Sequence, residues 1–556
     1  MRVAACLLIA SLVRAEDPPA PKPIRLVLQI TVDGLRGDML GRDRAHLDKG
    51  GFRTLLTRGV VFANAQYRHA NTETIVGHST LATGSYPRDH GMISNLWFDR
   101  TTGHPAYNVE DGEYPLLRTR EEAGKGKQLD PTQRAARTDG RSPRNIRGTT
   151  FSDELRSHTA GKAKVFAVSA KDRGAIPLAG HGGKAYWYSV ASGDFVTSRY
   201  YVEAYPEWVK AWNAKRPALA FEGKTWELLD ARKTYLFRER DDRPYERDIQ
   251  GFGRTFPHPY GPASAPTYFT RLAVGPAGDE LTASFATELL VREQLGQDDV
   301  PDYLAVSFSG VDFTNHFFGP SSLENEDHLR QLDRTLAKFL VAVDRHVGLD
   351  RTIIALCADH GMAEMPEAMA EAGLTAKRLY SDDVMQAARR AAHVKYGAKE
   401  LVRRLIRPYV YLDEVVLEEQ ELDRDEVAAY LADQLTRIEG IARAVPRKVQ
   451  AAVGGAGPLG RVQRNFNEER SGDIYLVQEP YWFFFERSPI GAMHGSPWRY
   501  DTFVPLIFVV PGVEARTVHR RVHPSDLAPT LSALLGTKQP AMARGTALVE
   551  VTSARR

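Results

Sequence analysis

Residues 24–33 read I-R-L-V-L-Q-I-T-V-D, an almost unbroken apolar run that ends on a carboxylate. Short runs of the same kind recur at 164–170 (K-V-F-A-V-S-A), 303–310 (Y-L-A-V-S-F-S-G), 352–358 (T-I-I-A-L-C-A) and 503–510 (F-V-P-L-I-F-V-V). Such runs suit strands that are buried on both faces of a mostly parallel sheet. The amphipathic segment 325–346 is typical of the helices that cover such a sheet. The sequence therefore predicts an α/β fold.

Charged and metal-competent residues follow four of these runs. They are Asp33 after the first, Lys171 and Arg173 after the second, Asp312 and His316 after the third, and Asp359 and His360 after the fourth. Open α/β sheets bind ligands beyond the carboxyl ends of their strands. One such residue is commonly part of a turn, but four runs that deliver these groups to one edge predict a functional site.

The acidic and histidine members of this set are oxygen and nitrogen ligands. His494, in the glycine-flanked G-A-M-H-G-S-P, adds a further nitrogen ligand. Three aspartates and three histidines suffice for two transition-metal sites that keep an open position for substrate. The spacing of Asp312 and His316 places both on one face if that segment is helical. Paired metals suit phosphoryl transfer because they stabilise both the attacking and the leaving oxygen.

The basic pair lies in V-S-A-K-D-R. In an extended conformation, Lys171 and Arg173 point the same way. An Arg fork beside a Lys point charge is a suitable clamp for a dianionic phosphate. The residues alone also allow a solvated basic turn.

The stretch A-N-T-E-T-I-V-G-H-S-T (70–80) packs four hydroxyls, a glutamate and a histidine at the start of a helix-like run. A Thr or Ser at such a position is commonly an N-cap. The stretch alone therefore does not say which hydroxyl, if any, is a nucleophile.

The composition is that of an ordinary globular protein. The chain has 556 residues, with 43% hydrophobic and 26% charged residues and a net charge of +3. This length fits one large domain that carries insertions. The charge gives no argument for binding nucleic acid or an anionic membrane.

The N-terminus predicts a secreted or periplasmic protein. Residues 1–15 have a positive charge, an apolar run and a V-R-A end, which together indicate a signal peptide cleaved after Ala15, with a proline-rich spacer at 16–23. A buried amphipathic helix is the alternative for this segment. No stretch approaches about 18 apolar residues, so no membrane span is predicted. Cleavage would leave Cys357 as the one cysteine, which we interpret as a small buried thiol.

The motifs together resemble the alkaline phosphatase superfamily from the strand before Asp33 to about residue 546. The matching elements are V-D-G-L-R, T-x-x-G-H-x-x-x-x-T-G-x-x-P-x-x-H-G-M-I-x-N, D-F-x-x-H-x-x-G-P, A-D-H-G-M, H-G-S and H-P-S-D-L-A-P-T-L-S-A-L-L-G. Within the superfamily the chain is most similar to periplasmic, phosphate-irrepressible bacterial phosphatases (PafA-like). The resemblance implies a three-layer sandwich around the mostly parallel sheet. It also implies a monomer that hydrolyses small-molecule phosphate monoesters to an alcohol and inorganic phosphate.

Carried over by motif, the resemblance implies two Zn²⁺ per chain. One zinc would be bound by Asp33, Thr74, Asp359 and His360, and the other by Asp312, His316 and His494. Thr74 would be the nucleophile, with a phosphothreonine intermediate. Asn95, Lys171 and Arg173 would bind the phosphoryl oxygens, and Lys171 and Arg173 would also stabilise the charge of the transition state.

The chain departs from its relatives at Val76, where T-x-P-G-H is common. This change removes no ligand but raises the question of how rigid the loop is. Thr72 and Glu73 are interpreted as loop and capping residues, and Ser79 and Thr80 as helical. His78 is expected to pack or hydrogen-bond beneath the site, and His90 to be structural.

Three insertions are expected, at about 100–150, 184–275 and 365–485, with a tail at 547–556. The first reads as long loops over the site, the second as a cap that shapes the leaving-group pocket, and the third as a second α/β unit. For Y-W-F-F-F (481–485) we favour a buried edge strand over a pocket lining.

Two rival functions remain at the level of sequence. A nucleotide pyrophosphatase/phosphodiesterase of the same superfamily would share the metals and the Thr nucleophile, but it is not expected to carry the Lys171-x-Arg173 pair. A non-catalytic phosphate-ester binding protein would have lost one or more ligands. A sulfatase is excluded because Thr74 stands where a modifiable Cys or Ser is needed.

Overall fold

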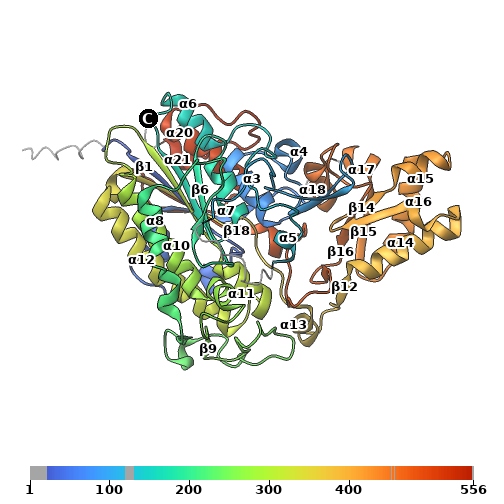
Figure 1. Ribbon diagram of the computed structural model, residues 1–556, viewed down its shortest axis with the longest axis horizontal. Helices are drawn as coiled ribbons and strands as arrows, with labels where there is room; N and C mark the ends of the chain where they lie inside the picture. Colours follow the sequence, from blue (N-terminus) through green and yellow to red (C-terminus); the bar gives the residue numbers. More distant parts are fainter. Residues whose placement is uncertain (1–21, 119–129, 453, 456, 554–556) are drawn as a thin grey trace, which may run out of the picture.

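The computed structural model describes residues 22–118, 130–452, 454, 455 and 457–553. The predicted signal peptide and most of the spacer lie outside these residues. A nine-stranded sheet forms the centre of the described chain (Figure 1). In spatial order its strands are β19 (Arg516–Val518), β2 (Val60–Gln66), β18 (Phe503–Val509), β11 (Thr352–Cys357), β1 (Leu26–Val32), β10 (Asp302–Phe308), β5 (Val165–Ser169), β6 (Lys184–Tyr188) and β7 (Phe195–Val196).

The register of the central strands brings their ends level. β1 runs parallel to β10 and β11, and β10 runs parallel to β5, with Val32 opposite Phe308 and Ser307 opposite Ser169. β18 is antiparallel to its neighbours β11 and β2. The mostly parallel sheet is therefore confirmed, and the residues that follow β1, β5, β10 and β11 emerge at one edge.

These four strands are buried along their whole length. Burial on both faces explains why their sequences are continuous apolar runs and not alternating patterns. Cys357 at the end of β11 is a free, buried thiol, as predicted, and burial raises its pKa.

Helices cover both faces of the sheet (Figure 1). One layer contains α2 (Phe52–Arg58), α10 (Pro276–Arg292) and α12 (Leu323–His346), and the other contains α3 (Thr74–Thr83), α6 (Phe151–His158), α7 (Asp172–Ala179) and α20 (Leu527–Leu535). α12 begins two residues before the predicted boundary because the Ser322 hydroxyl caps it, accepting from the Asn325 amide at 3.1 Å. These layers form the predicted three-layer sandwich.

Shorter elements lie in and before the segments that we interpret as the first two insertions (about 100–150 and 184–275). The second of these segments also contains β6 and β7, which belong to the central sheet. Between residues 87 and 134 lie α4 (Pro87–His90), β3 (Leu96–Asp99), β4 (His104–Tyr107) and α5 (Pro131–Arg134). Between 207 and 274 lie α8 (Glu207–Ala214), β8 (Thr225–Trp226), β9 (His258–Pro259) and α9 (Tyr268–Val274). α11 (Gly310–Phe318) follows β10 directly.

Residues 365–485 form a second α/β unit beside the main sheet, at the right of Figure 1. Its four-stranded sheet consists of β13 (Val402–Ile406), β14 (Tyr409–Leu412), β16 (Ile474–Gln478) and β15 (Ile441–Pro446). Its helices include α14 (Ser381–Tyr396), α15 (Glu414–Glu419), α16 (Arg424–Thr436), α17 (Arg447–Ala452) and α18 (Pro458–Asn465). This unit has its own cluster of buried side chains, among them Leu401, Leu431 and Leu476.

The segment 481–485 contributes β17 (Phe483–Phe485), which pairs with β12 (Arg378–Tyr380) and is buried.

Among the described residues, no helix combines the length and the apolar character that a membrane span requires.

Candidate active site

Three buried aspartates lie at the carboxyl edge of the central sheet. Asp33 directly follows β1, and its amide donates to the Phe308 carbonyl of β10 at 2.9 Å. Asp359 follows β11, and its Oδ1 accepts from the amides of Gly34 (3.2 Å) and His360 (3.0 Å). Asp312 lies in the first turn of α11, directly after β10. The strand ends thus bring together carboxylates that are remote in sequence.

Asp312 and His316 share one face of α11, as their spacing predicts. Their side chains approach to 3.4 Å between Asp312 Oδ2 and His316 Nε2, and Asp312 Oδ1 lies 3.7 Å from His494 Nε2. His494 therefore joins this pair from the loop before β18.

Three histidines are held by backbone carbonyls. The Nδ1 atoms of His316, His360 and His494 lie 2.9, 2.8 and 2.7 Å from the carbonyl oxygens of Ala492, Gly361 and Thr72. Because a carbonyl oxygen can only accept, each Nδ1 carries a proton, and in the neutral imidazole each Nε2 then presents a lone pair. This tautomer is the one that a metal ligand needs.

The structure gathers these side chains into two groups that could hold a metal ion. One is Asp312, His316 and His494, and the other is Asp33, Asp312 and His360; within each group the ligand atoms lie within 4.8 Å of one another. Asp312 thus belongs to both groups. Asp359 lies beside the second group, with its Oδ2 3.4 Å from His360 Nε2.

Several of these ligand atoms have no hydrogen-bond partner among the described residues. They are Asp33 Oδ1, Asp312 Oδ1, Asp359 Oδ2 and His360 Nε2, all buried. Leaving buried polar atoms unpartnered is costly. Unpartnered carboxylate oxygens beside imidazole lone pairs are the donor set of a site for Zn²⁺ or a similar transition metal, so the residues fit such a group.

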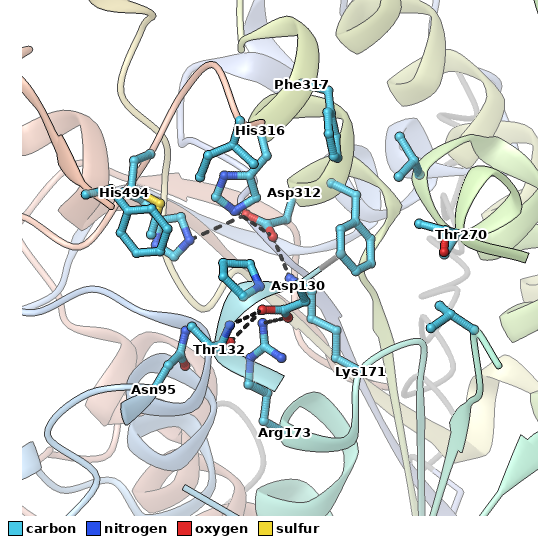
Figure 2. A pocket seen from close by; sticks show the side chains of 18 residues that line it. Asn95, Asp130, Thr132, Lys171, Arg173, Thr270, Asp312, His316, Phe317 and His494 are labelled. Carbon is cyan, nitrogen blue, oxygen red and sulfur yellow. Dashed lines mark hydrogen bonds and ion pairs between the residues drawn. The ribbon is translucent and has the colours of Figure 1, made fainter. Parts of the chain in front are cut away.

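The basic pair does not have the extended conformation that we expected. Lys171 is the N-cap of α7 and Arg173 lies in its first turn, yet both line the same pocket (Figure 2). Lys171 Nζ lies 2.7 Å from Asp33 Oδ2 and 2.5 Å from Asp312 Oδ2. Burial opposes its charge, but the carboxylates of Asp312 and Asp33 prevail and raise the pKa of Lys171. The alternative of a solvated basic turn is therefore excluded.

The Arg173 guanidinium is held by partners that the sequence did not reveal. Its Nη2 forms a 2.6 Å ion pair with Asp130 Oδ2, and its Nη1 lies 3.4 Å from the Tyr107 hydroxyl. Tyr107 donates to Asp172 Oδ1 at 2.6 Å, and Arg141 pairs with Asp172 Oδ2 at 2.7 Å. Burial acts to raise the pKa of Asp130, but Arg173, helped by Thr132 and Lys171, prevails and lowers that pKa to about 2. The sequence marks Asp130 only as a helix cap before Pro131.

Thr74 is the first residue of α3 and is buried. Gly77, one turn later, allows the helix to approach Asp359, because a Cβ at this position would overlap the Asp359 carbonyl. His78 Nδ1 donates to the Thr74 carbonyl at 2.8 Å and lies 3.2 Å from Asp359 Oδ2, while its Nε2 bonds to Ser307 Oγ at 2.8 Å. His78 therefore lies beneath the site, as expected, and fixes the start of the helix. Val76 is fully buried within α3.

Glu73 has a different role from the one that we expected. It occupies the N-cap position of α3, but its side chain makes no capping bond. Instead, Glu73 Oε2 accepts from the Asn95 amide (2.5 Å) and the Ser94 hydroxyl (2.8 Å), and Oε1 pairs with Arg407 at 2.6 Å. The Glu73 carboxylate thus ties the Thr74 helix to the loop that carries Asn95. Asn95 Oδ1 accepts from the Ile75 amide at 3.2 Å, which leaves its Nδ2 as the donor for a ligand.

A cavity of about 60 Å³ is lined by part of this set, including the cation pair and the Asp312, His316 and His494 group (Figure 2). Thr74, Asp33, Asp359 and His360 are not among the residues that line it. Its polar wall consists of Asn95, Asp130, Thr132, Lys171, Arg173, Thr270, Asp312, His316 and His494. Its apolar wall includes Val190, Ala273 and Val274 from the second predicted insertion and Phe485 from β17. The segment 481–485 is therefore both a buried strand and, through Phe485, part of the pocket lining.

Residues 27–497 match the family model described as type I phosphodiesterase / nucleotide pyrophosphatase. Among curated relatives, a Myroides odoratus protein named as a calcium-transporting ATPase is 31% identical and covers 98% of this chain and 97% of its own length. Alkaline phosphatase PhoV of Synechococcus elongatus is 31% identical over 95% of this chain and 92% of its own, and alkaline phosphatase PafA of Elizabethkingia meningoseptica is 30% identical over 98% and 97%.

The crystal structure of wild-type PafA superimposes with a TM-score of 0.86 at 30% identity, covering 97% of this chain and all of that one. A parallel sheet with carboxylates, histidines and a cation pair at its carboxyl edge defines the class as an α/β hydrolytic enzyme of the alkaline phosphatase superfamily. The chain belongs to the type I phosphodiesterase / nucleotide pyrophosphatase family within that superfamily, and it is PafA-like.

Proposed function

We propose that this phosphoric monoester hydrolase binds two zinc ions and transfers the phosphoryl group through Thr74. The observation that carries the proposal is the convergence of three imidazole lone pairs and unpartnered carboxylate oxygens beside a buried Lys–Arg pair. One zinc is assigned to Asp33, Thr74, Asp359 and His360, and the other to Asp312, His316 and His494. Bound there, the ions would supply Lewis-acid stabilisation of the attacking and leaving oxygens.

The residues of the chain then perform the following steps. The Thr74 hydroxyl oxygen, at the positive end of α3, attacks phosphorus in line with the leaving oxygen, and the N-terminal end of the helix favours its anionic form. The P–O bond to the leaving group breaks as the bond to Thr74 forms; the Thr74 hydroxyl gives up its proton to solvent, and the departing alkoxide takes up a proton and leaves as the alcohol. A water molecule attacks the phosphothreonine from the side that the alcohol has left, which releases inorganic phosphate and restores Thr74.

Three donors hold the non-bridging oxygens during this transfer. Asn95 Nδ2 is available because its Oδ1 is bound to the Ile75 amide. Lys171 and Arg173 supply two positive charges, which match the dianion of a monoester better than the monoanion of a diester. In a solved structure of a PafA variant, a threonine is replaced by serine, and an asparagine, a lysine and an arginine are replaced by alanine; these are the four residue types of this set.

The rival function is a phosphodiesterase, which the name of the matching family favours. Likeness to murine and human ectonucleotide pyrophosphatase / phosphodiesterase 5 (TM-scores of 0.51 to 0.53, 14% identity) supports the fold alone. The buried Lys171 and Arg173 favour the monoesterase because a diester carries one charge less.

The discriminating experiment compares kcat/KM of the zinc-loaded protein on an aryl phosphate monoester, its methyl diester and the matched sulfate. We expect a strong monoester preference, about two zinc ions per chain by elemental analysis, and loss of turnover in Thr74→Ala. A preference for the diester would assign the protein to the rival function, and stoichiometric zinc without turnover would support the binding protein.

The remaining expectations from the sequence belong to this proposal. They are a signal peptide at 1–15, a spacer at 16–23, one catalytic domain at 24–546 with three insertions, a tail at 547–556, a periplasmic or secreted location, and a monomer. The apolar wall at Val190, Ala273 and Val274 supports a role for the second insertion in holding the leaving group.

A further inference from the structure

A second cavity, of about 160 Å³, lies beyond the end of β2. Its lining is dominated by four arginines, Arg68, Arg461, Arg464 and Arg521, with His523 beside them. It shares no lining residue with the catalytic cavity. Four arginines therefore converge on a separate concave surface, two of them (Arg461 and Arg464) from α18 of the second α/β unit and two (Arg68 and Arg521) from the main domain.

None of these four arginines forms an ion pair with a carboxylate of the described chain. Arg461 donates to Thr502 Oγ1 at 3.1 Å, Arg464 to the carbonyls of Gly460 (2.8 Å) and Gly455 (3.1 Å), and Arg521 to Gln66 Oε1 at 2.8 Å. These acceptors are neutral, so they leave the positive charges uncompensated. In the catalytic pocket, by contrast, Arg173 and Lys171 each pair with carboxylates.

The charges repel one another. Burial and the neighbouring Arg521 and Arg464 lower the pKa of Arg461 to about 10. The pKa of Arg464 is also lowered, by burial and by Arg68. The fully buried His69, adjacent to Arg68, is kept neutral, because burial together with Arg461 and Arg464 lowers its pKa to about 3. Arg68, Arg461 and Arg464 are half-buried and Arg521 is exposed. Half-buried charges without a counter-charge are costly, and an anion bound between them would relieve that cost.

One acidic residue, Asp526, lies near the arginine cavity, where its charge acts on His523. Its two oxygens accept from the backbone amides of His523 (2.9 Å) and Thr546 (3.0 Å). It therefore caps the turn after His523 and does not neutralise the arginines.

We propose that Arg68, Arg461, Arg464 and Arg521, with His523 beside them, bind a small, multiply charged oxyanion of the phosphate class at a second site. Planar guanidinium forks match the geometry of tetrahedral oxyanions and bind them through paired hydrogen bonds. Liquid water occupies about 30 Å³ per molecule, so the cavity has room for a free phosphate ion with some of its water. A half-buried cavity of this size favours a free ion over the headgroup of a lipid.

The arginine cavity is connected to the segment before Thr74 through α18. Asn465, next to Arg464 on α18, accepts from the Asn71 amide through Oδ1 (3.0 Å) and donates to the Ile93 carbonyl through Nδ2 (3.0 Å). These backbone groups lie shortly before Thr74 and Asn95. An anion bound to Arg464 would therefore rest on the helix that supports both catalytic loops.

The test measures binding of inorganic phosphate to the full chain at constant ionic strength, in a Lys171→Ala/Arg173→Ala background that weakens the catalytic subsite. We expect one phosphate per chain in this background. Adding Arg461→Gln/Arg464→Gln should weaken the binding at least tenfold, whereas Arg390→Gln, on an exposed face of α14, should leave it unchanged. Equal affinity in the background and in the Arg461/Arg464 variant would overturn the proposal.

If the Arg461→Gln/Arg464→Gln substitution perturbs the fold, thermal unfolding of a milder variant provides a second test. A bound anion stabilises the native protein by RT ln(1 + [anion]/Kd), so at one phosphate concentration the rise in Tm is larger for the tighter site. Phosphate should therefore raise the Tm of the Lys171→Ala/Arg173→Ala background. The rise should be clearly smaller when Arg464→Gln is added to this background. Identical rises would count against the site. Vesicles that contain phosphatidylglycerol form the second arm: arginine-dependent binding to them without binding of free phosphate would overturn the assignment to a free ion.

Discussion

Replacing Arg173 by alanine should separate monoesters from diesters. A hydrogen bond to a charged group contributes about 1.5–3 kcal/mol, so a fork that makes two such bonds to a monoester contributes about 3–6 kcal/mol. At about 1.4 kcal/mol per tenfold change, kcat/KM for an aryl monoester should fall by about 10²–10⁴. The methyl diester has one charged oxygen fewer, so its loss should be about 10–10² on the same scale. The ratio of monoester to diester kcat/KM is then expected to fall at least tenfold.

For this assay, Arg173 is a better position to replace than Lys171, because its replacement leaves the candidate metal ligands in place. Lys171 contacts Asp33 and Asp312, so its removal also alters the candidate metal ligands, whereas Arg173 contacts Asp130 and Tyr107. Arg173→Ala leaves the buried Asp130 carboxylate without its guanidinium partner, which costs stability. The Arg173→Ala/Asp130→Asn variant removes that charge and should keep the altered ratio. Arg144→Ala, at an exposed arginine paired with Glu113, is the matched control. Equal losses on both substrates would refute the role of Arg173 in charge recognition.

Three further predictions follow from individual side chains. Asp312→Asn should lower the zinc content of the purified chain more than Asp33→Asn does, because Asp312 is assigned to one zinc and also lies beside the Asp33 and His360 ligand atoms of the other; elemental analysis measures the zinc content, and equal losses would show that Asp312 affects one zinc alone. Gly77→Ala should reduce both kcat and Tm, at a cost of about 1–3 kcal/mol, because its Cβ would push α3 away from the Asp359 carbonyl; unchanged kcat at a lowered Tm would limit Gly77 to a packing role. Glu246→Gln should stabilise the protein in a pH-dependent manner, because burial and the neighbouring Glu324 raise the pKa of Glu246 from 4.5 to about 9. The unfolded chain ionises near the ordinary value and the native chain does not, so the native protein loses stability as pH rises from 4.5 to about 9. The gain in Tm from Glu246→Gln should increase over that range and level off above it, and a gain that is independent of pH would contradict this explanation.

The parts of the structure that the sequence predicted are those that depend on local patterns. β1, β5, β10 and β11 were visible because strands buried on both faces must be apolar at every position. Their parallel register follows from the fold class, so the positions of Asp33 and Asp359 after level strand ends could be predicted as well. The face shared by Asp312 and His316 follows from helix geometry alone.

The groups that hold these residues in place depend on contacts between remote segments. Asp130 reaches Arg173 from a loop, and nothing in D-P-T beyond a helix cap indicates that pairing. The predicted extended conformation of Lys171 and Arg173 was also wrong, because α7 begins at Asp172, between the two residues. The arginine cavity was invisible for the same reason, since Arg68 and Arg521 are separated by most of the chain and meet only at the edge of the folded sheet.

Arg407 shows why the second α/β unit belongs to the catalytic architecture. It lies between β13 and β14, and it pairs with Glu73 Oε1 at 2.6 Å while donating to the His494 carbonyl at 2.8 Å. Glu73 in turn holds the Asn95 amide, and His494 is one of the three histidines whose lone pairs converge. Both Arg407 and Glu73 are buried, so removing either would leave an uncompensated charge that costs about 3–5 kcal/mol. One buried ion pair thus joins a unit far along the chain to the Thr74 helix, the Asn95 loop and the His494 loop at once, and the position of the second unit becomes a condition for the geometry of the site.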